Sequence, residues 1–538
     1  MRNIKVAICT IVYLILYGCA NVQPPTGGPV DETPPKIVQQ TPQQNEINFR
    51  EQHMEIVFDE AINLQNIQNN LMITPLTEIE YEAHVRRNVL TLDFEEPFEE
   101  NTTYTFNFRE AIRDVTENNV AENLQFAFST GPYLDSIIVE GTVKDLLTNQ
   151  PLPDINVSLY HAGDTNDITN SRPVYLSKTD NNGRYRITNI KNGHYDIYAL
   201  EDESNNMLYE KESERIAFKK NLDLNVNQSG VNLSVAKFIT TPPNISSTTS
   251  IDNNIRIVFD RGLESLELTL LEDTAHTLYY NPGEEGKTFT LYNTVQHDDS
   301  LDLGVVATDS SLNVLRDTVR VAFDTRTKKL KEEVIRNIKP TNNKLNPNEP
   351  FIEILFSKPV VSVLHDSINL SIDTLDIPID NQQYSFNQYR NILIFDNIES
   401  FRDSIILELH AQSFINVTGD TSASRQAKFT PYNGDELGLI SGRVETEDEN
   451  FILELLNTRH QVITRVINAT TFNFPFLEPG QYQLRYIQDL NANQRWDSGN
   501  LLEQRQPEPV IFYRETINVR ANWEIRDIVF DVSAKKGQ

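Results

Sequence analysis

One strand-like segment occurs three times in this sequence and restricts the fold more than any other feature. Each copy is an apolar, β-rich run that reaches a Phe and then stops at two polar or charged residues. The copies are Glu55–Glu60 (EIVFDE), Arg256–Arg261 (RIVFDR) and Glu353–Lys358 (EILFSK). A chain that repeats one strand at long intervals is expected to repeat a domain built around that strand.

A second strand-like segment follows each copy at a nearly constant distance. The Phe-to-Phe separations are 70 residues (Phe58 to Phe128), 64 residues (Phe259 to Phe323) and 73 residues (Phe356 to Phe429). We expect closing strands at 126–130, 321–325 and 427–431. Short strands separated by turn residues over about a hundred residues predict a β-sandwich. We call these three predicted sandwiches type A.

Another segment occurs twice, with a closer match. Residues 185–197 (YRITNIKNGHYDI) align with residues 472–484 (FNFPFLEPGQYQL), and both carry a Gly and then a Tyr at matched positions. Alternating apolar and polar residues around this Gly predict a hairpin with one buried face. Each unit opens with a Gly-x-Val strand, at Gly141 and at Gly442. We call these two units type B.

The units follow one another in the order A, B, A, A, B, and helical periodicity is nearly absent. The sequence therefore predicts an all-β protein, a tandem array of about five small β-sandwich domains. At 538 residues the chain is also too long for a single core. The predicted domains are 37–132, 136–235, 236–330, 333–432 and 436–535.

The N-terminus carries the pattern of an export signal. Two basic residues precede an apolar run of eleven residues at 6–16, which is too short to span a bilayer. The run ends at Leu-Tyr-Gly-Cys (16–19), which resembles a bacterial lipobox, although Tyr17 stands where a small residue is usual. The resemblance implies cleavage after residue 18 and acylation of Cys19, with palmitate among the chains. An ordinary secretory signal with an incidental Cys is the alternative.

Cysteine count and net charge agree with a lipid anchor. The second Cys, Cys9, lies inside the predicted signal 1–18, so the mature chain would keep Cys19 alone and form no internal disulfide. Residues 19–36, rich in Pro and Gly, are expected to form an extended tether. The net charge of −30 would repel phosphate backbones and anionic head groups. We therefore expect no nucleic-acid partner, and attachment to a membrane through lipid rather than through a basic surface.

Two family resemblances add to this interpretation. The first and third type A copies resemble bacterial Ig-like domains of the SbsA type, with the entry Thr33-Pro34-Pro35 and the closing Phe-Ser-Thr at 128–130. The second copy departs from that pattern, because Arg261-Gly262 replaces the usual Glu-Pro. The stretch 19–35 looks like the start of gram-negative, Bacteroidota-type outer-membrane lipoproteins. Type B units resemble the seven-stranded carboxypeptidase-regulatory, or transthyretin-like, sandwich, which implies a binding or spacer module without catalytic residues.

A loop rich in Asp and Asn follows the predicted hairpin of each type B unit and is the main candidate for a metal site. Short oxygen-bearing side chains at alternate positions, closed by a carboxylate, could form an oxygen cage for calcium. The alternative is that these side chains bond their own backbone and shape a long turn. Neither loop has the Gly or the spacing of an EF-hand, which favours the structural alternative. The candidate ligands are Asp489, Asn491, Asn493 and Asp497, and, with Ser in place of Asn, Asp202, Ser204, Asn206 and Glu210.

No catalytic constellation stands out in the sequence. The nine His form neither a His-x-His nor a His-Glu-x-x-His pair, and we find no Gly-x-Ser-x-Gly elbow or phosphate-binding Gly loop. Trp496, beside the second loop, could anchor a sugar or a protein partner, or could simply lie in the domain core. We predict no catalytic residues.

Taken together, these features predict a non-catalytic lipoprotein scaffold at the outer membrane. We expect it to bind protein partners, such as an integral outer-membrane complex for barrel assembly or transport, a location that only the family resemblance suggests. Glycan binding at the cell surface is the alternative, and a hydrolase is the least supported function. The sequence slightly favours the cell surface over the periplasmic face.

Overall fold

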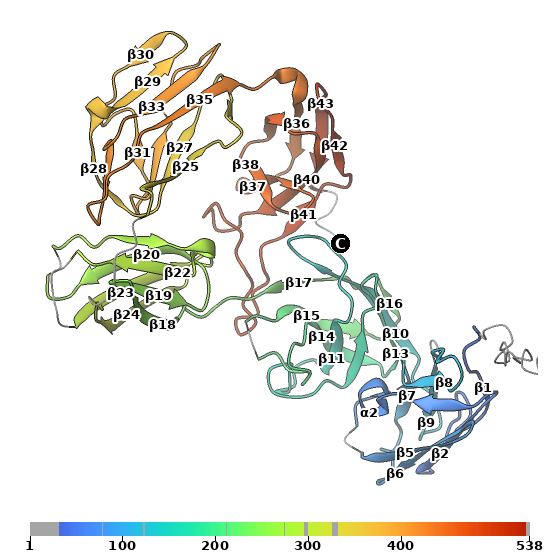
Figure 1. Ribbon diagram of the computed structural model, residues 1–538. Helices are drawn as coiled ribbons and strands as arrows, with labels where there is room; N and C mark the ends of the chain where they lie inside the picture. Colours follow the sequence, from blue (N-terminus) through green and yellow to red (C-terminus); the bar gives the residue numbers. More distant parts are fainter. Residues whose placement is uncertain are drawn as a thin grey trace, which may run out of the picture. The chain divides into compact units, whose positions relative to one another are not determined.

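The computed structural model describes residues 32–77, 79–121, 124–210, 212–273, 275–294, 300–324, 332–396 and 398–533. The predicted signal and Cys19 lie outside these residues. The described elements are almost all β-strands, with one four-residue helix, α2 (Ile67–Asn70), and three short 3-10 helices (Figure 1). None of the helices in the described ranges has the length and apolar character needed to cross a membrane. The protein is therefore an all-β array of sandwiches, as predicted.

The chain divides into two compact units, which we describe separately. Unit 1 comprises residues 1–144, 151–210 and 217–233. Unit 2 comprises residues 145–150, 211–216 and 234–538. We number the sandwiches one to five in chain order. Unit 1 holds the first and most of the second, and unit 2 holds the third, fourth and fifth with three short segments of the second, 145–150, 211–216 and the end of its last strand.

Each of the three type A copies forms a four-stranded sheet, and the strands are arranged in the same way in all three. In each, the repeated segment is the second strand, and its Phe is buried, with exposed fractions of 1% for Phe58, 2% for Phe259 and 3% for Phe356. The first strand pair also has a register shift at the same place in all three copies. The sheets are β1 (Ile37–Thr41), β2 (His53–Phe58), β6 (Val89–Phe94), β5 (Tyr81–Arg86); β18 (Ile245–Ile251), β19 (Asn254–Phe259), β22 (Thr288–Tyr292), β21 (Tyr280–Pro282); and β25 (Ile335–Lys339), β27 (Ile352–Phe356), β32 (Ile392–Phe395), β31 (Ser385–Phe386).

A second sheet completes each type A sandwich. The first closing segment lies in β9 and the third in β35, but β24 ends at Val321, so residues 322–324 continue outside the strand. Phe323 still packs against the core of the third sandwich. The sheets are β4 (Met72–Thr74), β7 (Thr103–Asn107), β9 (Gln125–Ser129); β20 (Leu263–Leu270), β23 (Leu301–Asp309), β24 (Val314–Val321); and β26 (Lys344–Leu345), β35 (Arg425–Pro431), β33 (Ile405–Leu409), β29 (Ile368–Ile372), β30 (Leu375–Ile377). Two small strand pairs remain, β3 (Ile62–Leu64) with β8 (Ile112–Asp114) and β28 (Val360–Val363) with β34 (Phe414–Asn416).

Each type B sandwich has eight strands, one more than the resemblance implies. The second sandwich has the strand order β12-β11-β14-β15-β17-β10-β13, with β16 beside β10. Its strands are β10 (Ile137–Asp145), β11 (Asn156–His161), β12 (Tyr175–Lys178), β13 (Arg184–Ile190), β14 (Gly193–Leu200), β15 (Arg215–Leu224), β16 (Gln228–Ser229) and β17 (Leu233–Lys237). The fifth has sheets β39-β36-β43 and β38-β37-β40-β41, with β42 beside β40. Its strands are β36 (Gly438–Glu445), β37 (Phe451–Asn457), β38 (Val462–Ile467), β39 (Thr471–Leu477), β40 (Gly480–Gln488), β41 (Val510–Phe512), β42 (Ile517–Val519) and β43 (Glu524–Asp531).

The prediction that each type B segment forms a hairpin of two paired strands is wrong. In the second sandwich β13 pairs with β10, whereas β14 pairs with β11, so the turn at Gly193 joins two strands that do not pair with each other. In the fifth sandwich β39 pairs with β36 and β40 with β37. The alternating pattern is satisfied either way, because strands that face each other across a core alternate like strands of one hairpin.

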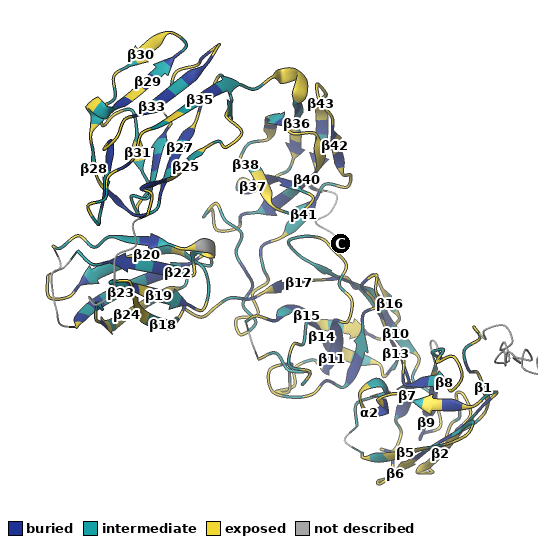
Figure 2. Cartoon of the chain, in the orientation of Figure 1, coloured by how far each residue is buried: buried dark blue, intermediate teal, exposed yellow. Residues whose placement is uncertain are grey.

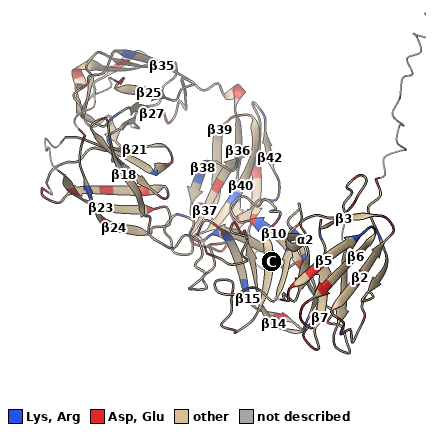
Figure 3. Cartoon of the chain, turned by 60° about the horizontal axis from the view of Figure 1, so that its bottom comes forward, with Lys and Arg blue, Asp and Glu red and all other residues tan. Residues whose placement is uncertain are grey.

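Separate cores hold the sandwiches. The first, third, fourth and fifth each have their own cluster of buried apolar side chains. Buried positions lie mainly on the strands (Figure 2). Basic and acidic residues are scattered over strands and loops of both units (Figure 3). Because each sandwich has only a small core of its own, we expect ligands and partners to bind at loops and at the boundaries between domains.

Candidate functional site

The second Asp/Asn loop closes on its own backbone. Asp489, 2% exposed, directly follows β40. Its Oδ1 accepts a hydrogen bond from the backbone N–H of Asn493 at 3.0 Å, and its Oδ2 accepts one from Gln494 at 2.8 Å. A carboxylate that accepts two backbone N–H groups a few residues ahead fixes a turn without any metal. This geometry supports the structural interpretation of the loop.

The other three predicted ligands of this loop also come together. The side-chain amides of Asn491 and Asn493 both donate to Asp497 Oδ2, at 2.5 Å and 2.8 Å. Calcium takes oxygen ligands, so these two amides would have to present their oxygens instead. Within the described ranges, no group of three or more His, Cys, Asp or Glu is placed to hold a metal ion. Calcium binding therefore stays a prediction.

A residue that the sequence interpretation passed over, Glu508, organises the same loop. Its side chain is buried, and its two oxygens accept the backbone N–H groups of Leu490 at 2.6 Å and Asp497 at 2.9 Å. Burial raises the pKa of Glu508, and the charges of Asp497 and Asp489 add to the rise although the two N–H groups oppose it. The signal was present in the sequence. Glu508 opens the segment after the loop, where the first type B unit has the equally buried Glu214.

Trp496 is half-buried beside this loop. Its indole N–H donates to the carbonyl oxygen of Glu508 at 3.1 Å, which ties the ring to its own domain. The other Trp, Trp523, is 52% exposed and lies under the Arg520 guanidinium at 4.7 Å. An anchoring role for Trp496 stays a prediction.

The first Asp/Asn loop closes in the same way. Asp202 accepts the backbone N–H of Asn206 at 3.2 Å and that of Met207 at 2.8 Å, the same two offsets as in the second loop. Asn206 Oδ1 accepts the N–H of Leu208, whereas the Ser204 hydroxyl is buried with no hydrogen-bond partner among the described residues. Glu210 is exposed. The two loops therefore share one local structure.

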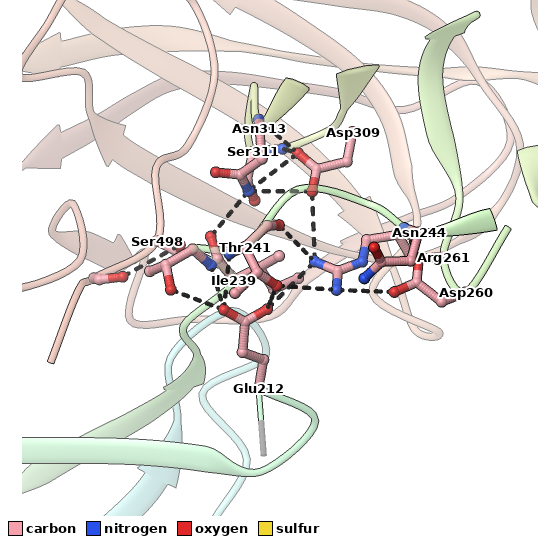
Figure 4. Close-up of polar contacts among 12 residues, drawn as sticks. Glu212, Ile239, Thr241, Asn244, Asp260, Arg261, Asp309, Ser311, Asn313 and Ser498 are labelled. Atoms are coloured by element: carbon pink, nitrogen blue, oxygen red, sulfur yellow. Dashed lines mark hydrogen bonds and ion pairs between the residues drawn. The ribbon is translucent and has the colours of Figure 1, made fainter. Parts of the chain in front are cut away.

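In unit 2 a joint forms around Arg261, the residue at which the second type A copy departs from its family pattern. Figure 4 shows its guanidinium between three carboxylates, at 3.3 Å from Glu212, 3.2 Å from Asp260 and 3.6 Å from Asp309. It also donates to the carbonyl oxygen of Thr241 at 3.2 Å. The carboxylates, mainly Asp260, raise the pKa of Arg261 although its partial burial opposes this.

Each partner of Arg261 is itself held in place. Glu212 accepts the backbone N–H groups of Thr240 and Thr241 at 2.8 and 2.9 Å and both of their hydroxyls. Burial raises the pKa of Glu212, but these bonds outweigh it and leave the pKa below its ordinary value. Asp309, 1% exposed, accepts the N–H groups of Ser311 and Asn313. Both terminal nitrogens of Arg261 are therefore engaged by residues of the joint.

Packing explains why the neighbouring residue, Gly262, has no side chain. A Cβ on this residue would lie 2.7 Å from the carbonyl oxygen of Glu285. A side chain would therefore force the two backbone segments apart. Of the Arg-Gly pair that breaks the family pattern, Arg261 thus serves the joint and Gly262 serves packing within the third sandwich.

The second Asp/Asn loop lies beside this joint. A small pocket of about 220 Å³ is lined by Asp497 and Ser498 on one side and by Thr240 and Asn313 on the other. Arg495 forms an ion pair with Glu264 of β20 at 3.1 Å. A Cβ on Gly499 would lie 2.6 Å from the ring of Phe238, so the loop packs tightly there. The fifth sandwich thereby reaches back to the start of the third.

Comparisons with known proteins support the fold of one domain. Residues 31–130 match the family model of a bacterial Ig-like domain. A search of curated proteins found no match. The similar solved structures include a candidate carbohydrate-binding protein from Bacteroides uniformis, with 14% identity over 35% of this chain and 98% of that chain and a TM-score of 0.14. The N-terminal part of the bacterial S-layer protein SbsC has 13% identity over 39% and 45%, with a TM-score of 0.15.

A third similar structure is BcpA, the major pilin subunit of Bacillus cereus, with 8% identity over 74% of this chain and 99% of that chain and a TM-score of 0.13. These three scores are low, and we draw nothing about function from them. The family match is the informative result, because it covers the first predicted sandwich from its Thr-Pro-Pro entry to its closing Phe-Ser-Thr. The first sandwich of this chain therefore carries a bacterial Ig-like domain.

Proposed function

We propose that this chain is a non-catalytic scaffold, anchored to the outer membrane through acylated Cys19, that binds a protein partner. The Arg261 joint is the observation that carries the proposal. Three carboxylates and the carbonyl oxygen of Thr241 converge on one guanidinium, so the boundary is fixed by charge-assisted hydrogen bonds. A fixed boundary suits a scaffold that must hold loops at set positions, whereas a flexible string of domains would need no such network.

The described chemistry supports a binding role rather than a reaction. Three of the buried carboxylates of unit 2, Glu508, Asp309 and Asp489, accept backbone N–H groups. Their environments are accounted for by loop closure. A lipid tether would confine the search for a membrane partner to two dimensions and raise its effective concentration.

Two measurements test the proposal. Metabolic labelling with an alkyne palmitate should mark the wild-type chain, and Cys19→Ala should abolish both the label and sedimentation with membranes. Affinity purification of the full chain from detergent-solubilised membranes should recover an integral membrane protein in near-stoichiometric amount. Release of the wild-type chain into the medium would refute the anchor. Selective binding on a glycan array without a co-purified protein would refute the scaffold in favour of glycan capture.

A further inference from the structure

Unit 1 contains a cleft that no contact described so far explains. It has a volume of about 600 Å³, within the range of ligand-binding clefts. One wall comes from the first sandwich, from α2, β4 and the loop after β7, and the other from β12 and the first Asp/Asn loop. The sandwiches are joined beside it by a hydrogen bond from Leu76 N–H to the Val174 carbonyl at 2.8 Å.

Three cations line this cleft without partners. Arg109, Arg172 and Lys178 form no ion pair and no side-chain hydrogen bond with any described residue. In a chain with 77 acidic and 47 basic residues, partners for three cations should be easy to supply. Burial lowers the pKa of Arg109, and the charges of Asp154 and Glu110 oppose this only at longer range. Unpaired like charges around one cavity favour an anionic occupant.

The only acidic residue among the described lining residues is neutralised locally. Asp202 accepts the N–H groups of Asn206 and Met207 and the side-chain amide of Asn156. The Asp202 carboxylate therefore stabilises the loop and does not neutralise the three cations. The overall charge of −30 is screened beyond about 8 Å at physiological salt, so the local positive field decides what enters.

The rest of the lining fits a peptide better than a sugar. The apolar part consists of aliphatic and thioether side chains, including Met72, Ile79, Leu176 and Met207. Methionine adapts to varied apolar partners. The single aromatic residue, Tyr81, packs its ring against Phe94 of its own domain at 5.5 Å. A lining that combines aliphatic side chains with cations suits an extended strand that carries both acidic and apolar side chains.

Side-chain amides that line the cleft also suit a peptide ligand. Gln68, Asn69 and Asn205 line the cleft and can bond a peptide backbone, since each offers both a donor and an acceptor. Asn156 also lines it, is 6% exposed, and its Oδ1 has no hydrogen-bond partner within the described structure. An unmet acceptor beside the cleft is a second, independent sign that a donor is missing.

We infer that this cleft binds an extended acidic peptide segment of a partner protein. The inference rests on the proposed function and deepens it by naming the chemistry of the partner. Carboxylates of the segment would meet Arg109, Arg172 and Lys178, and its apolar side chains would lie on the Met and Leu side chains. The cleft belongs to unit 1, and the joint that carries the proposed function belongs to unit 2.

The test uses the full chain in detergent and a fluorescein-labelled peptide, Asp-Leu-Glu-Val-Asp-Leu-Glu, followed by fluorescence anisotropy. The wild-type chain should bind it, and raising salt from 50 to 300 mM should weaken binding about tenfold. The variant R109Q/R172Q/K178Q should lose about tenfold or more in affinity. The matched variant R336Q/K428Q/R514Q removes three unpaired cations in unit 2 and should change affinity less than about twofold.

Several outcomes would overturn the inference. One is equal binding by both triple variants, and another is equal binding of a peptide with Asn and Gln in place of Asp and Glu. A uronate oligosaccharide that displaces the peptide at lower concentration would assign the cleft to a glycan instead. Absence of peptide binding while a membrane partner still co-purifies would remove the cleft and leave the scaffold. Peptide binding with no co-purified partner would remove the scaffold and leave the cleft.

Discussion

The two Asp/Asn loops share one internal structure but border different surroundings. Asp202 and Asp489 each accept backbone N–H groups four and five residues ahead. The first loop lines a cleft of about 600 Å³ in unit 1 whose cations are unpaired. The second lines a pocket of about 220 Å³ in unit 2, beside the ion pairs of Arg261.

This difference shows that the loop alone does not define a role. Loop closure is local, since it needs only an Asp and the backbone that follows it. The surroundings come from the type A sandwich that each loop meets. At Arg261 the cation beside the loop is paired, and its ion pairs hold the two sandwiches together. At Arg172 and Lys178 the cations beside the loop are unpaired, which leaves that boundary between sandwiches open to a ligand.

The largest expected effect comes from Arg261→Ala. The variant would leave the buried Asp309 and the partly buried Glu212 without their shared counter-ion. We expect a loss of about 2 kcal/mol from unit 2, less than for a fully buried pair because the Arg261 side chain is 23% exposed. Urea unfolding of the full chain, followed by Trp fluorescence, measures it. Both Trp belong to unit 2.

A matched control comes from the same sandwich. Arg320 forms a two-pronged ion pair with Asp302, but its side chain is 71% exposed. Arg320→Ala should therefore change stability much less than Arg261→Ala. Equal losses for the two variants would show that the joint is no stronger than a surface pair, and the comparison between joint and cleft would lose its basis.

A smaller, pH-dependent effect is expected for Glu212→Gln. The pKa of Glu212 lies below its ordinary value of 4.5, so its stabilising contribution is complete above that value and is lost as the pH falls through the lower folded-state pKa. At pH 7 the variant should lose about 1 kcal/mol, because the neutral amide accepts weaker hydrogen bonds from Thr240 and Thr241.

Melting curves between pH 7 and pH 3 check this. The difference in Tm between wild type and Glu212→Gln should shrink toward zero at the acid end. Glu515→Gln, at an exposed position, removes the same charge and should leave the Tm at the wild-type value. A difference that grows on acidification would mean that Glu212 is held as the neutral acid, and the proposed network would be wrong.

The repeated strands were predictable because their information is local. The segments ending at Phe58, Phe259 and Phe356 carry the same β-rich pattern, and each takes the same place in its sheet. Loop closure was predictable for the same reason, since Asp489 and its N–H donors are neighbours in sequence. The family match at 31–130 then confirmed the first of these sandwiches as Ig-like.

Long-range partners were not predictable from one sequence. Alternation around Gly193 and Gly480 fits paired strands and strands facing each other across a core equally well, which is why the hairpins were predicted wrongly. Arg261 stood out as a departure from a family pattern, yet its partner Glu212 lies 49 residues earlier in the chain. No local signal connects them. The cleft cations likewise come from two separate segments, with Arg109 more than sixty residues before Arg172 and Lys178.

A still smaller effect on stability is expected for the cleft cations. Arg172→Gln and Lys178→Gln remove charges without ion-pair partners, so each should change the free energy of unfolding by no more than about 0.5 kcal/mol. Urea unfolding of these two variants and of Arg261→Ala under the same conditions compares their losses of stability directly. A loss as large as that of Arg261→Ala would mean that these side chains hold the first two sandwiches together, and the cleft would then be a joint like the one in unit 2.

The smallest expected effect is that of calcium on the two loops. Asp497 Oδ2 already accepts two side-chain amides, and both oxygens of Asp489 accept backbone N–H groups, so each loop is closed without a metal. The Tm in 1 mM calcium and in 1 mM EDTA should differ by less than about 1 °C, because a ligand at a hundred times its dissociation constant would instead add about 2.7 kcal/mol. A rise of several degrees in calcium that Asp497→Asn abolishes and Asp202→Asn does not would assign a calcium site to the second loop. The two loops would then differ in their own chemistry and not only in their neighbours.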